Sequence, residues 1–276
     1  MHHAERPEIV LQAQSGWVPV NWREIYATRE LLLTLIGRDL RVRYKQTVLG
    51  VGWAVIQPLL TMFVFAFTFS RFVPEMDTNG IPYPLYAYAG LVPWTFFSNA
   101  VNTAGISTIS QQHLLTKIYF PRVYAPASPV GAGLVDMLVA SGLFAMLLPF
   151  YRIVPSWQVV FLPLLIAVTF IATLGAGLAT SALVVLFRDF RFVLSFSLQL
   201  LLFLTPVIFP ATNFGKYAYL LALNPMFGLV DGFRAAVFGM PWNFPILAIS
   251  TASAFATFLF GIYFFRRIER HIADII

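Results

Sequence analysis

Cysteine is absent from this chain of 276 residues, which excludes disulfide bonds, iron–sulfur clusters and metal sites with thiolate ligands. Charge is also scarce: Asp, Glu, Lys and Arg make up 11% of the residues, against about 25% in an average soluble domain. The chain is instead 59% hydrophobic, with a mean hydropathy of +0.76. So little charge cannot cover a soluble globule of this size, and the apolar runs are long enough to cross a bilayer. We therefore expect a polytopic membrane protein.

The sequence also lacks a nucleotide-binding motif. The phosphate-cradling motif G-x-x-x-x-G-K-[ST] needs a lysine after a glycine, and only Lys216 meets that condition. Pro210 stands where the motif needs its first glycine, and Tyr217 where it needs Ser or Thr. The sequence also lacks the His-Glu-x-x-His zinc motif and a plausible catalytic triad. We expect no enzyme activity, no metal site and no cofactor in this chain.

Ionisable residues are nearly absent from the apolar runs. Each costs about 2.5–3.5 kcal/mol at the centre of a spanning helix, and apart from Arg71 at the end of the first run only Asp136 lies inside one. A single shallow acid could serve a proton relay, but acids in membranes readily find buried hydrogen-bonding partners. We favour the structural role for Asp136 and keep the relay as the alternative.

Six apolar segments are long enough to cross about 30 Å of hydrocarbon as helices. They cover about residues 53–72, 85–104, 131–150, 157–187, 192–209 and 245–265. Backbone groups in lipid must find hydrogen bonds within their own segment, so all six are predicted to be helical. The predicted fold class is an all-α membrane protein with six transmembrane helices.

The distribution of Lys and Arg predicts the orientation of these helices. With the N-terminus inside the cell, fourteen of the eighteen basic residues fall in cytoplasmic segments and four in external loops. Cytoplasmic loops of membrane proteins carry an excess of Lys and Arg. Both termini are therefore predicted to be cytoplasmic.

The segment before the first span is amphipathic. In "RELLLTLIGRDLRVRYKQTVLG" basic residues and leucines recur at spacings of three and four on different faces, which is typical of a helix that lies in the membrane interface. We predict this interface helix within residues 23–52, between an N-terminal arm at 1–22 and a transmembrane domain at 53–276. The helix either anchors the first span or contacts a partner. Its basic positions are Arg38, Arg41, Arg43 and Lys45.

The external connection at 210–243 is too apolar for a solvated loop and too broken by Gly and Pro to span. Short re-entrant or interfacial helices fit it better, either as a lid over the loop ends or as an external gate. Asp231 and Arg234 lie three residues apart and are able to pair on one helix. The candidate gate residues are Asn224, Pro225, Asp231 and Arg234.

A short basic segment, "LLTKIYFPRVYAP", separates the second and third apolar runs. Pro121 and Pro126 should make it stiff. A stiff cytoplasmic element between two spanning helices is suited to transmitting force from a docked partner. Its residue content alone favours an ordinary cytoplasmic loop.

Aromatic residues are abundant, at 16% of the chain. Most are expected to face lipid, the membrane interface or neighbouring helices, but some could stack on sugar rings along a transport path. The candidates for such a path are Phe63, Phe67, Trp94 and Phe97.

Four stretches together resemble the permease subunit of bacterial type-2 ABC exporters for polysaccharides, which move O-antigen, teichoic acid and capsular glycans. They are "RDLRVRYKQTVLGVGWAVIQPLL", "LLTKIYFPRVYAP", "LFRDFRFVLSFSLQLLLFLTPVIFP" and "LNPMFGLVDGFR". Each is weak alone, but they stand in the family's order and at similar distances, and they cover most of the chain from about Arg29.

The resemblance implies a homodimer in the bacterial inner membrane that works with two copies of a separate ATPase, which holds the ATP and Mg. It implies a lipid-linked glycan as substrate, contact with membrane lipid and no nucleic acid. A cytoplasmic coupling helix at 108–122 would dock into the ATPase, and the loop at 187–192 would make a smaller contact. Short external helices would gate the exit. The implied coupling residues are His113, Lys117, Tyr119, Arg122, Arg188, Asp189 and Arg191.

Two other functions remain as alternatives. An ABC exporter of a drug, antibiotic or small lipid would share the architecture and differ in cargo. An integral-membrane enzyme or proton-coupled transporter would need several polar residues converging within the membrane, and the sequence offers only Asp136.

Overall fold

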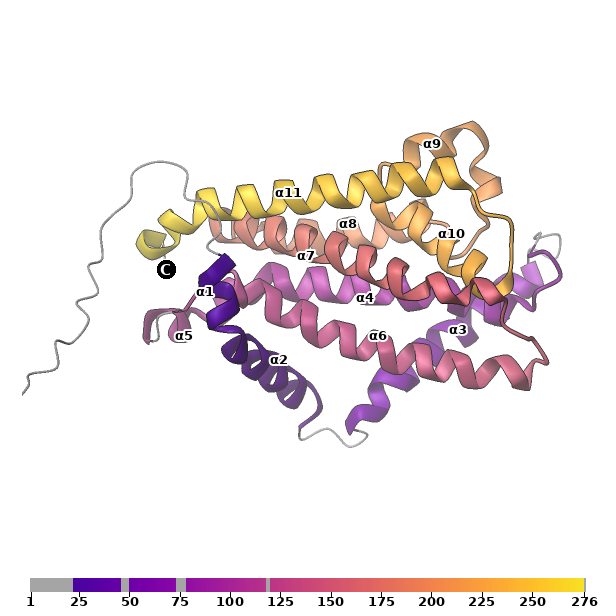
Figure 1. Ribbon diagram of the computed structural model, residues 1–276, viewed down its shortest axis with the longest axis horizontal. Helices are drawn as coiled ribbons and strands as arrows, with labels where there is room; N and C mark the ends of the chain where they lie inside the picture. Colours follow the sequence, from indigo (N-terminus) through magenta and orange to yellow (C-terminus); the bar gives the residue numbers. More distant parts are fainter. Residues whose placement is uncertain (1–21, 46–49, 73–77, 118–119, 276) are drawn as a thin grey trace, which may run out of the picture.

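A computed structural model describes residues 22–45, 50–72, 78–117 and 120–275. Within these ranges the chain forms helices and connections without a strand, as the sequence predicts. Four long helices run side by side along the length of the molecule (Figure 1). They are α4 (Tyr83–Ser110), α6 (Tyr124–Phe150), α7 (Leu162–Leu186) and α11 (Phe244–Ile275).

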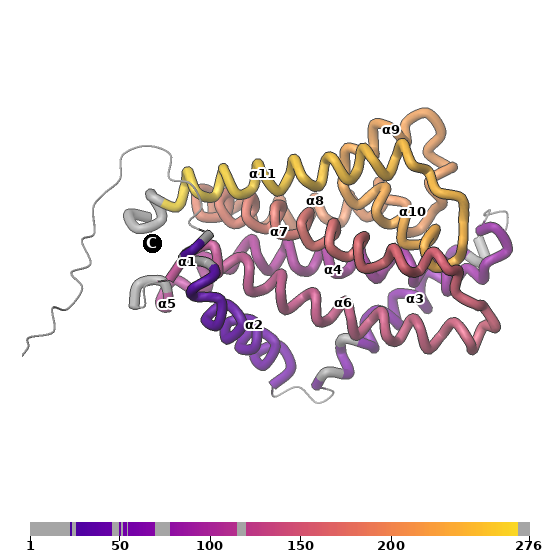
Figure 2. The backbone as a smooth tube through the Cα atoms, in the orientation of Figure 1, coloured from indigo at the N-terminus to yellow at the C-terminus, as the bar shows by residue number. Residues whose placement is uncertain are grey.

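Shorter elements gather at the two ends of this bundle. Figure 2 shows α1, α2, α5 and the C-terminal end of α11 at one end, called here the α5 end, and α9 and α10 at the other, the α10 end. The bounds of these elements and of the remaining ones, including α3 and α8 alongside the bundle, are α1 Trp22–Ala27, α2 Arg29–Tyr44, η1 Gly50–Gly52, α3 Trp53–Phe72, α5 Gln112–Lys117, η2 Trp157–Phe161, α8 Phe190–Leu204, η3 Ala211–Tyr217, α9 Ala218–Leu221 and α10 Pro225–Phe238.

Several of these helices are suited to a bilayer. By length and apolar composition, three segments in the described ranges can cross one: Tyr124–Phe150, Trp157–Leu186 and Phe244–Glu269. Two shorter apolar helices, Val55–Phe69 and Phe190–Leu204, coincide with predicted spans. Helix α4 is long enough but carries a series of Asn, Ser and Thr residues. A polytopic membrane fold is therefore confirmed, and the number of six spans stays a prediction.

Helix α4 lies at the centre of the bundle and packs against α3, α6, α7 and α10. Small residues let its neighbours approach closely. A Cβ atom added to Gly177 of α7 would lie 3.0 Å from the Cβ of Ala104, and one added to Gly133 of α6 would lie 3.2 Å from that of Ala100. Such close helix contacts are typical of membrane bundles, where packing replaces the hydrophobic drive between helices.

The predicted interface helix is present as α2 and packs against the first turns of α6. Leu35 is buried in a small apolar cluster with Phe120 and Tyr124. Ile36 lies against Gly131, where an added Cβ would meet it at 2.5 Å. The apolar face read from the sequence therefore binds protein in this chain, while Arg41 and Lys45 are exposed.

Candidate functional site

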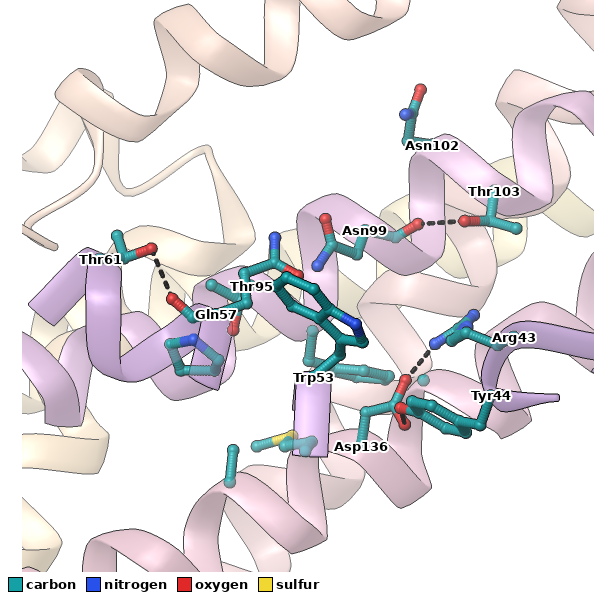
Figure 3. A pocket seen from close by; sticks show the side chains of 15 residues that line it. Arg43, Tyr44, Trp53, Gln57, Thr61, Thr95, Asn99, Asn102, Thr103 and Asp136 are labelled. Carbon is teal, nitrogen blue, oxygen red and sulfur yellow. Dashed lines mark hydrogen bonds and ion pairs between the residues drawn. The ribbon is translucent and has the colours of Figure 1, made fainter. Parts of the chain in front are cut away.

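A polar cleft of about 380 Å³ opens between α2, α3, α4 and α6 (Figure 3). Most of its side chains can form hydrogen bonds, in a region whose helices are otherwise apolar. The polar and charged residues of its lining are Arg43, Tyr44, Gln57, Thr61, Thr95, Asn99, Asn102, Thr103 and Asp136.

Helix α4 contributes a strip of polar side chains to this cleft. Thr95, Asn99, Asn102 and Thr103 lie at spacings of four, three and one, which places them on one helical face. The two threonine hydroxyls donate to the carbonyls of Leu91 and Asn99, each at 2.7 Å. Their hydrogen-bonding needs are thus met within α4.

The two asparagine amides of the strip are exposed on the surface of the chain. Asn102 Oδ1 accepts a hydrogen bond from Ser195 Oγ of α8 at 3.1 Å, so the strip also borders α8. An amide facing lipid without partners costs several kcal/mol. The face that carries Asn99 and Asn102 is therefore suited to water or a polar solute.

An ion pair fixes the end of α2 to the wall of the cleft. Arg43 Nη1 donates to one carboxylate oxygen of Asp136, and Tyr44 Oη donates to the other. Burial, together with the hydrogen bond to Asp136, raises the pKa of Tyr44 to about 12. Tyr44 therefore stays protonated and donating at neutral pH. Both oxygens of Asp136 have partners, which supports the structural role favoured from the sequence.

The first prediction concerns this ion pair. Replacing Asp136 by asparagine keeps an acceptor for Tyr44 but leaves the Arg43 cation unpaired. The pair is partly exposed, with side-chain exposures of 31% and 23%, so we expect a loss of about 1 kcal/mol in the free energy of unfolding. The melting temperature in detergent should fall by about 2–4 °C.

The matched control is Asp189→Asn, because Asp189 is exposed and forms none of the ion pairs in the described residues. Its melting temperature should not change. An unchanged melting temperature for Asp136→Asn, combined with a pH-dependent loss of transport, would instead support the proton relay.

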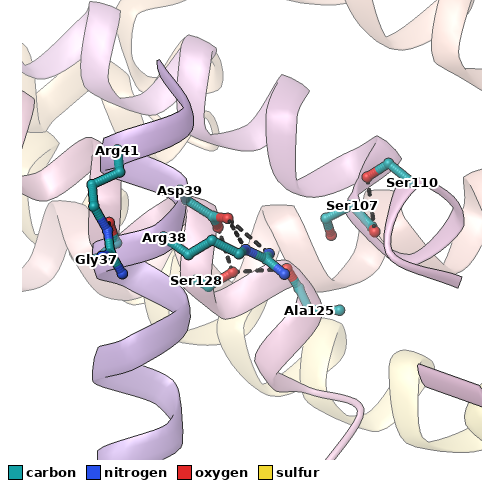
Figure 4. Close-up of polar contacts among 8 residues, drawn as sticks. All are labelled: Gly37, Arg38, Asp39, Arg41, Ser107, Ser110, Ala125 and Ser128. Carbon is teal, nitrogen blue, oxygen red and sulfur yellow. Dashed lines mark hydrogen bonds and ion pairs between the residues drawn. The ribbon is translucent and has the colours of Figure 1, made fainter. Parts of the chain in front are cut away.

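The α5 end holds a second set of polar contacts, and Figure 4 shows those that join α2 to α6. Ser128 Oγ of α6 donates to Asp39 Oδ2 of α2 at 2.7 Å. Arg38 donates to the other oxygen of Asp39, through Nη2 at 2.8 Å and Nε at 3.1 Å. Just before α6, Arg122 Nη1 donates to the backbone carbonyl of Glu269 in α11. The segment after α5 is thus tied to both α2 and α11.

At the α10 end, Arg234 is fully buried and binds three backbone carbonyls. Its guanidinium donates to Tyr86 at 3.0 Å, to Val207 at 2.6 Å and to Pro206, and it lies 3.8 Å from the centre of the Tyr86 ring. It forms no ion pair with Asp231, although their spacing allows one. Since α8 ends at Leu204, the carbonyls that follow need donors, and Arg234 is turned toward them.

A family model described as ABC-2 type transporter matches residues 30–238, more than half of the chain. The chain belongs to this ABC-2 membrane family. The O-antigen export system permease protein RfbA of Myxococcus xanthus is 31% identical over 236 residues, which cover 84% of this chain and 90% of the relative. RfbA of Klebsiella pneumoniae is 25% identical over 90% of this chain and 95% of its own length. The polysialic acid transport protein KpsM of Escherichia coli is 25% identical over 74% and 79%.

Membership of the ABC-2 family, together with the apolar helices, makes this chain a multi-pass protein of the inner membrane and a transport subunit that is not itself an enzyme. The residues that the resemblance assigns to coupling lie at the α5 end. His113 is exposed on α5, and Lys117 is the last residue of that helix. Tyr119 lies outside the described residues. Arg188 and Asp189 are exposed in the turn between α7 and α8, and Arg191 is exposed in the first turn of α8.

The basic positions of the interface helix do not act alike. Arg38 and Arg43 are in ion pairs, with Asp39 and Asp136. Arg41 Nε donates to the carbonyl of Gly37 at 3.2 Å (Figure 4), and Lys45 is exposed. Of these four positions, Arg41 and Lys45 thus have no carboxylate partner among the described residues.

The aromatic candidates for a path separate into two groups. Phe63 and Phe67 of α3 are 64% and 60% exposed and stack on one another, with ring centres 6.4 Å apart. Trp94 and Phe97 are buried in the main apolar cluster, at 4% and 5% exposure, and do not line the polar cleft. The place of all four residues on a path stays a prediction.

Two of the gate candidates, Asn224 and Pro225, form the N-terminal cap and first residue of α10. Asn224 Oδ1 accepts from the backbone N–H of Met226 at 3.1 Å, and its amide donates to Thr205 Oγ1 at 2.9 Å. Pro225 occupies the first helical position, where its missing N–H has no cost.

The amide side chains of the polar cleft, Gln57, Asn99 and Asn102, were not predicted from the sequence. Polar residues at spacings of three and four in an apolar helix were a signal that could have indicated them.

Proposed function

We propose that this chain is the membrane-spanning subunit of an ATP-driven exporter that moves a lipid-linked polysaccharide of the cell envelope across the inner membrane. The observation that carries the proposal is similarity over most of the chain to relatives named as O-antigen export permeases and a polysialic acid transport protein.

The polar cleft supports a hydrophilic cargo. A sugar chain presents many hydroxyl groups, and crossing hydrocarbon without partners would cost several kcal/mol for each unsatisfied group. The α4 strip offers amide and hydroxyl groups beside the exposed face of α3, where Phe63 and Phe67 stand. Two copies of the chain, facing one another across such surfaces, would form the path in a homodimer.

Energy must come from another protein, because this sequence has no phosphate-binding motif. Two copies of an ABC ATPase would bind ATP and Mg and dock at the α5 end, which would face the cytoplasm together with both termini. Helix α5, which exposes His113, and the α7–α8 turn are the docking elements in this proposal. Motion of α5 would reach α11 through Arg122 and α2 through the cluster around Leu35.

The test is co-purification from membranes of this chain with the ATPase encoded beside it. A stable complex with equal numbers of the two chains, and ATPase activity that changes in its presence, is the expected result. Failure to bind any ATPase subunit would overturn the proposal.

A charge reversal on α5 locates the contact. The double variant His113→Glu with Lys117→Glu should lose ATPase binding at least tenfold and stop export, because it places two acids on the docking helix. Arg122 is left unchanged, since its guanidinium binds Glu269 and its loss would disturb the fold. Pull-down and surface glycan staining give the two measurements.

The matched control is Lys216→Glu, which reverses an exposed charge at the α10 end. It should leave ATPase binding and export intact. Normal ATPase binding and export by the α5 double variant would remove α5 from the docking surface.

A further inference from the structure

A second cavity, of about 560 Å³, lies at the α10 end and plays no part in the proposed coupling. We call it the external pocket. It is enclosed by η3 and α9, by α10, by the connection from α10 to α11 and by Asn79 before α4. The residues used below are Asn79, Thr212, Tyr219, Asp231, Trp242 and Asn243, all of which line it.

Four aromatic residues line the pocket, Tyr86, Tyr219, Trp242 and Phe244, and two of them matter for the argument. Trp242 is held in place because its Nε1–H donates to Gln158 Oε1 at 2.8 Å and its ring stacks on Phe244 with centres 6.2 Å apart. Tyr219 is 55% exposed on α9. A fixed ring and an accessible ring together provide flat apolar surface without closing the pocket.

The lining combines apolar residues such as Ala211, Ala235 and Ile246 with a smaller set of hydrogen-bonding groups. Asp231 is a carboxylate on a helix that is otherwise almost entirely buried and apolar. It forms no hydrogen bond or ion pair within the described residues, because the cation beside it, Arg234, is occupied by three carbonyls. Thr212, Asn79 and Asn243 add hydroxyl and amide groups around the same cavity.

This chemistry narrows the ligand. A divalent cation prefers several oxygen ligands, and the described residues contain no cluster of three acidic, His or Cys residues. A hydrophobic solute would leave a carboxylate and amides without partners. A sugar ring satisfies both parts: its C–H face packs on an aromatic ring, and its hydroxyls donate to carboxylate and amide oxygens. The volume is in the range of small-molecule sites.

We propose that the external pocket binds a neutral sugar unit of the glycan as it leaves the exporter. Trp242 and Tyr219 provide the stacking surface, and Asp231 accepts hydrogen bonds from hydroxyl groups. Among the described residues of the lining, Asp231 is the charged one, so the pocket discriminates against sugars that carry a carboxylate. This inference rests on the proposed glycan export, and it adds a sugar class and a place.

The test uses the full chain in lipid nanodiscs and four free trisaccharides: mannotriose, rhamnotriose, the N-acetylglucosamine trimer and α2,8-trisialic acid. Binding is measured by tryptophan fluorescence and by saturation-transfer NMR. At least one neutral trisaccharide should bind, and trisialic acid should bind at least tenfold more weakly. Asp231→Asn, which keeps the side-chain shape, should weaken the neutral ligand at least tenfold.

Tyr219→Ala tests the stacking surface without touching the buried side of the pocket, and a comparable loss is expected. The matched controls are Tyr217→Ala and Asp189→Asn, because both residues are exposed and lie outside the pocket. Neither should change binding.

The proposal is overturned by absence of binding of every neutral trisaccharide, by equal binding of trisialic acid, or by unchanged binding in Asp231→Asn and Tyr219→Ala. These outcomes are separate from the failure of the proposed function, which is read from ATPase co-purification in the unaltered chain. A chain that binds its ATPase but no neutral trisaccharide keeps the exporter function and loses only the external pocket.

Discussion

Replacing Arg234 by methionine should destabilise this protein more than any other single substitution at the α10 end. The guanidinium is fully buried and donates to three carbonyls. Methionine has a similar length but no donor, so the carbonyls of Tyr86, Pro206 and Val207 would lose their partner. Each unsatisfied buried group costs about 1–3 kcal/mol, and we expect a total loss of about 3–5 kcal/mol.

The geometry explains why no other residue can replace it. Arginine presents a planar fork of donors, whereas lysine has a single compact ammonium group, so Arg234→Lys should also be destabilising, though less so. Space for the fork is provided by Gly90 of α4, where an added Cβ would lie 2.5 Å from Nη2 of Arg234. Gly90→Ala should therefore displace the Arg234 guanidinium and weaken its hydrogen bonds to the three carbonyls.

The melting temperature in detergent and the rate of proteolysis at η3 are the measurements. The matched control is Arg191→Met, since Arg191 is exposed at the other end of α8. It should behave as the unaltered chain. If Arg234→Met melted within a degree of the unaltered chain, the three carbonyls would have other donors and the hydrogen bonds of Arg234 would not stabilise the fold.

Valine at Gly261 should separate α7 from α11, which form one of the most extensive helix contacts in the molecule. A Cβ added to Gly261 would lie 2.1 Å from the backbone oxygen of Gly175, and one added to Gly175 would lie 2.4 Å from the Cα of Phe258. Both clashes are with backbone, which cannot rotate away as a side chain can. Overpacking typically costs 1–3 kcal/mol, and we expect about 3 kcal/mol or more here.

The chain offers a matched control for this substitution. Gly142 also lies within a long apolar helix, α6, but an added Cβ there meets nothing within 4 Å. Gly142→Val should therefore change the melting temperature little, while Gly261→Val and Gly175→Val lower it strongly and reduce the yield of folded protein. Equal melting temperatures for all three variants would show that α7 and α11 can separate without cost.

Patterns within single segments were read correctly from the sequence. Apolar length predicted the helices now seen as α3, α6, α7, α8 and α11, because a helix that crosses lipid must satisfy its own backbone. The spacing of leucines predicted a helix with one apolar face before the first span, and Leu35 on that face is buried. The break in apolar character after Pro210 predicted short helices, which are η3, α9 and α10.

Partners across segments were not readable. Asp231 and Arg234 have ideal spacing for a pair on one helix, yet Arg234 is turned toward carbonyls from α4 and from the end of α8. Trp94 and Phe97 have the same composition signal as Phe63 and Phe67, but a neighbouring helix covers the first two and not the others. Helical periodicity indicates on which side of its helix a residue lies, but not which other helix contacts that side.

The sequence by itself determined the class of this protein, a helical polytopic membrane protein, because length and hydropathy are properties of the chain alone. Only the tertiary structure decided that Asp136 binds α2, that Arg234 closes the α10 end and that Asp231 faces a pocket. Such contacts depend on which helices become neighbours, and the close approach of glycines such as Gly175 and Gly261 sets that distance by packing.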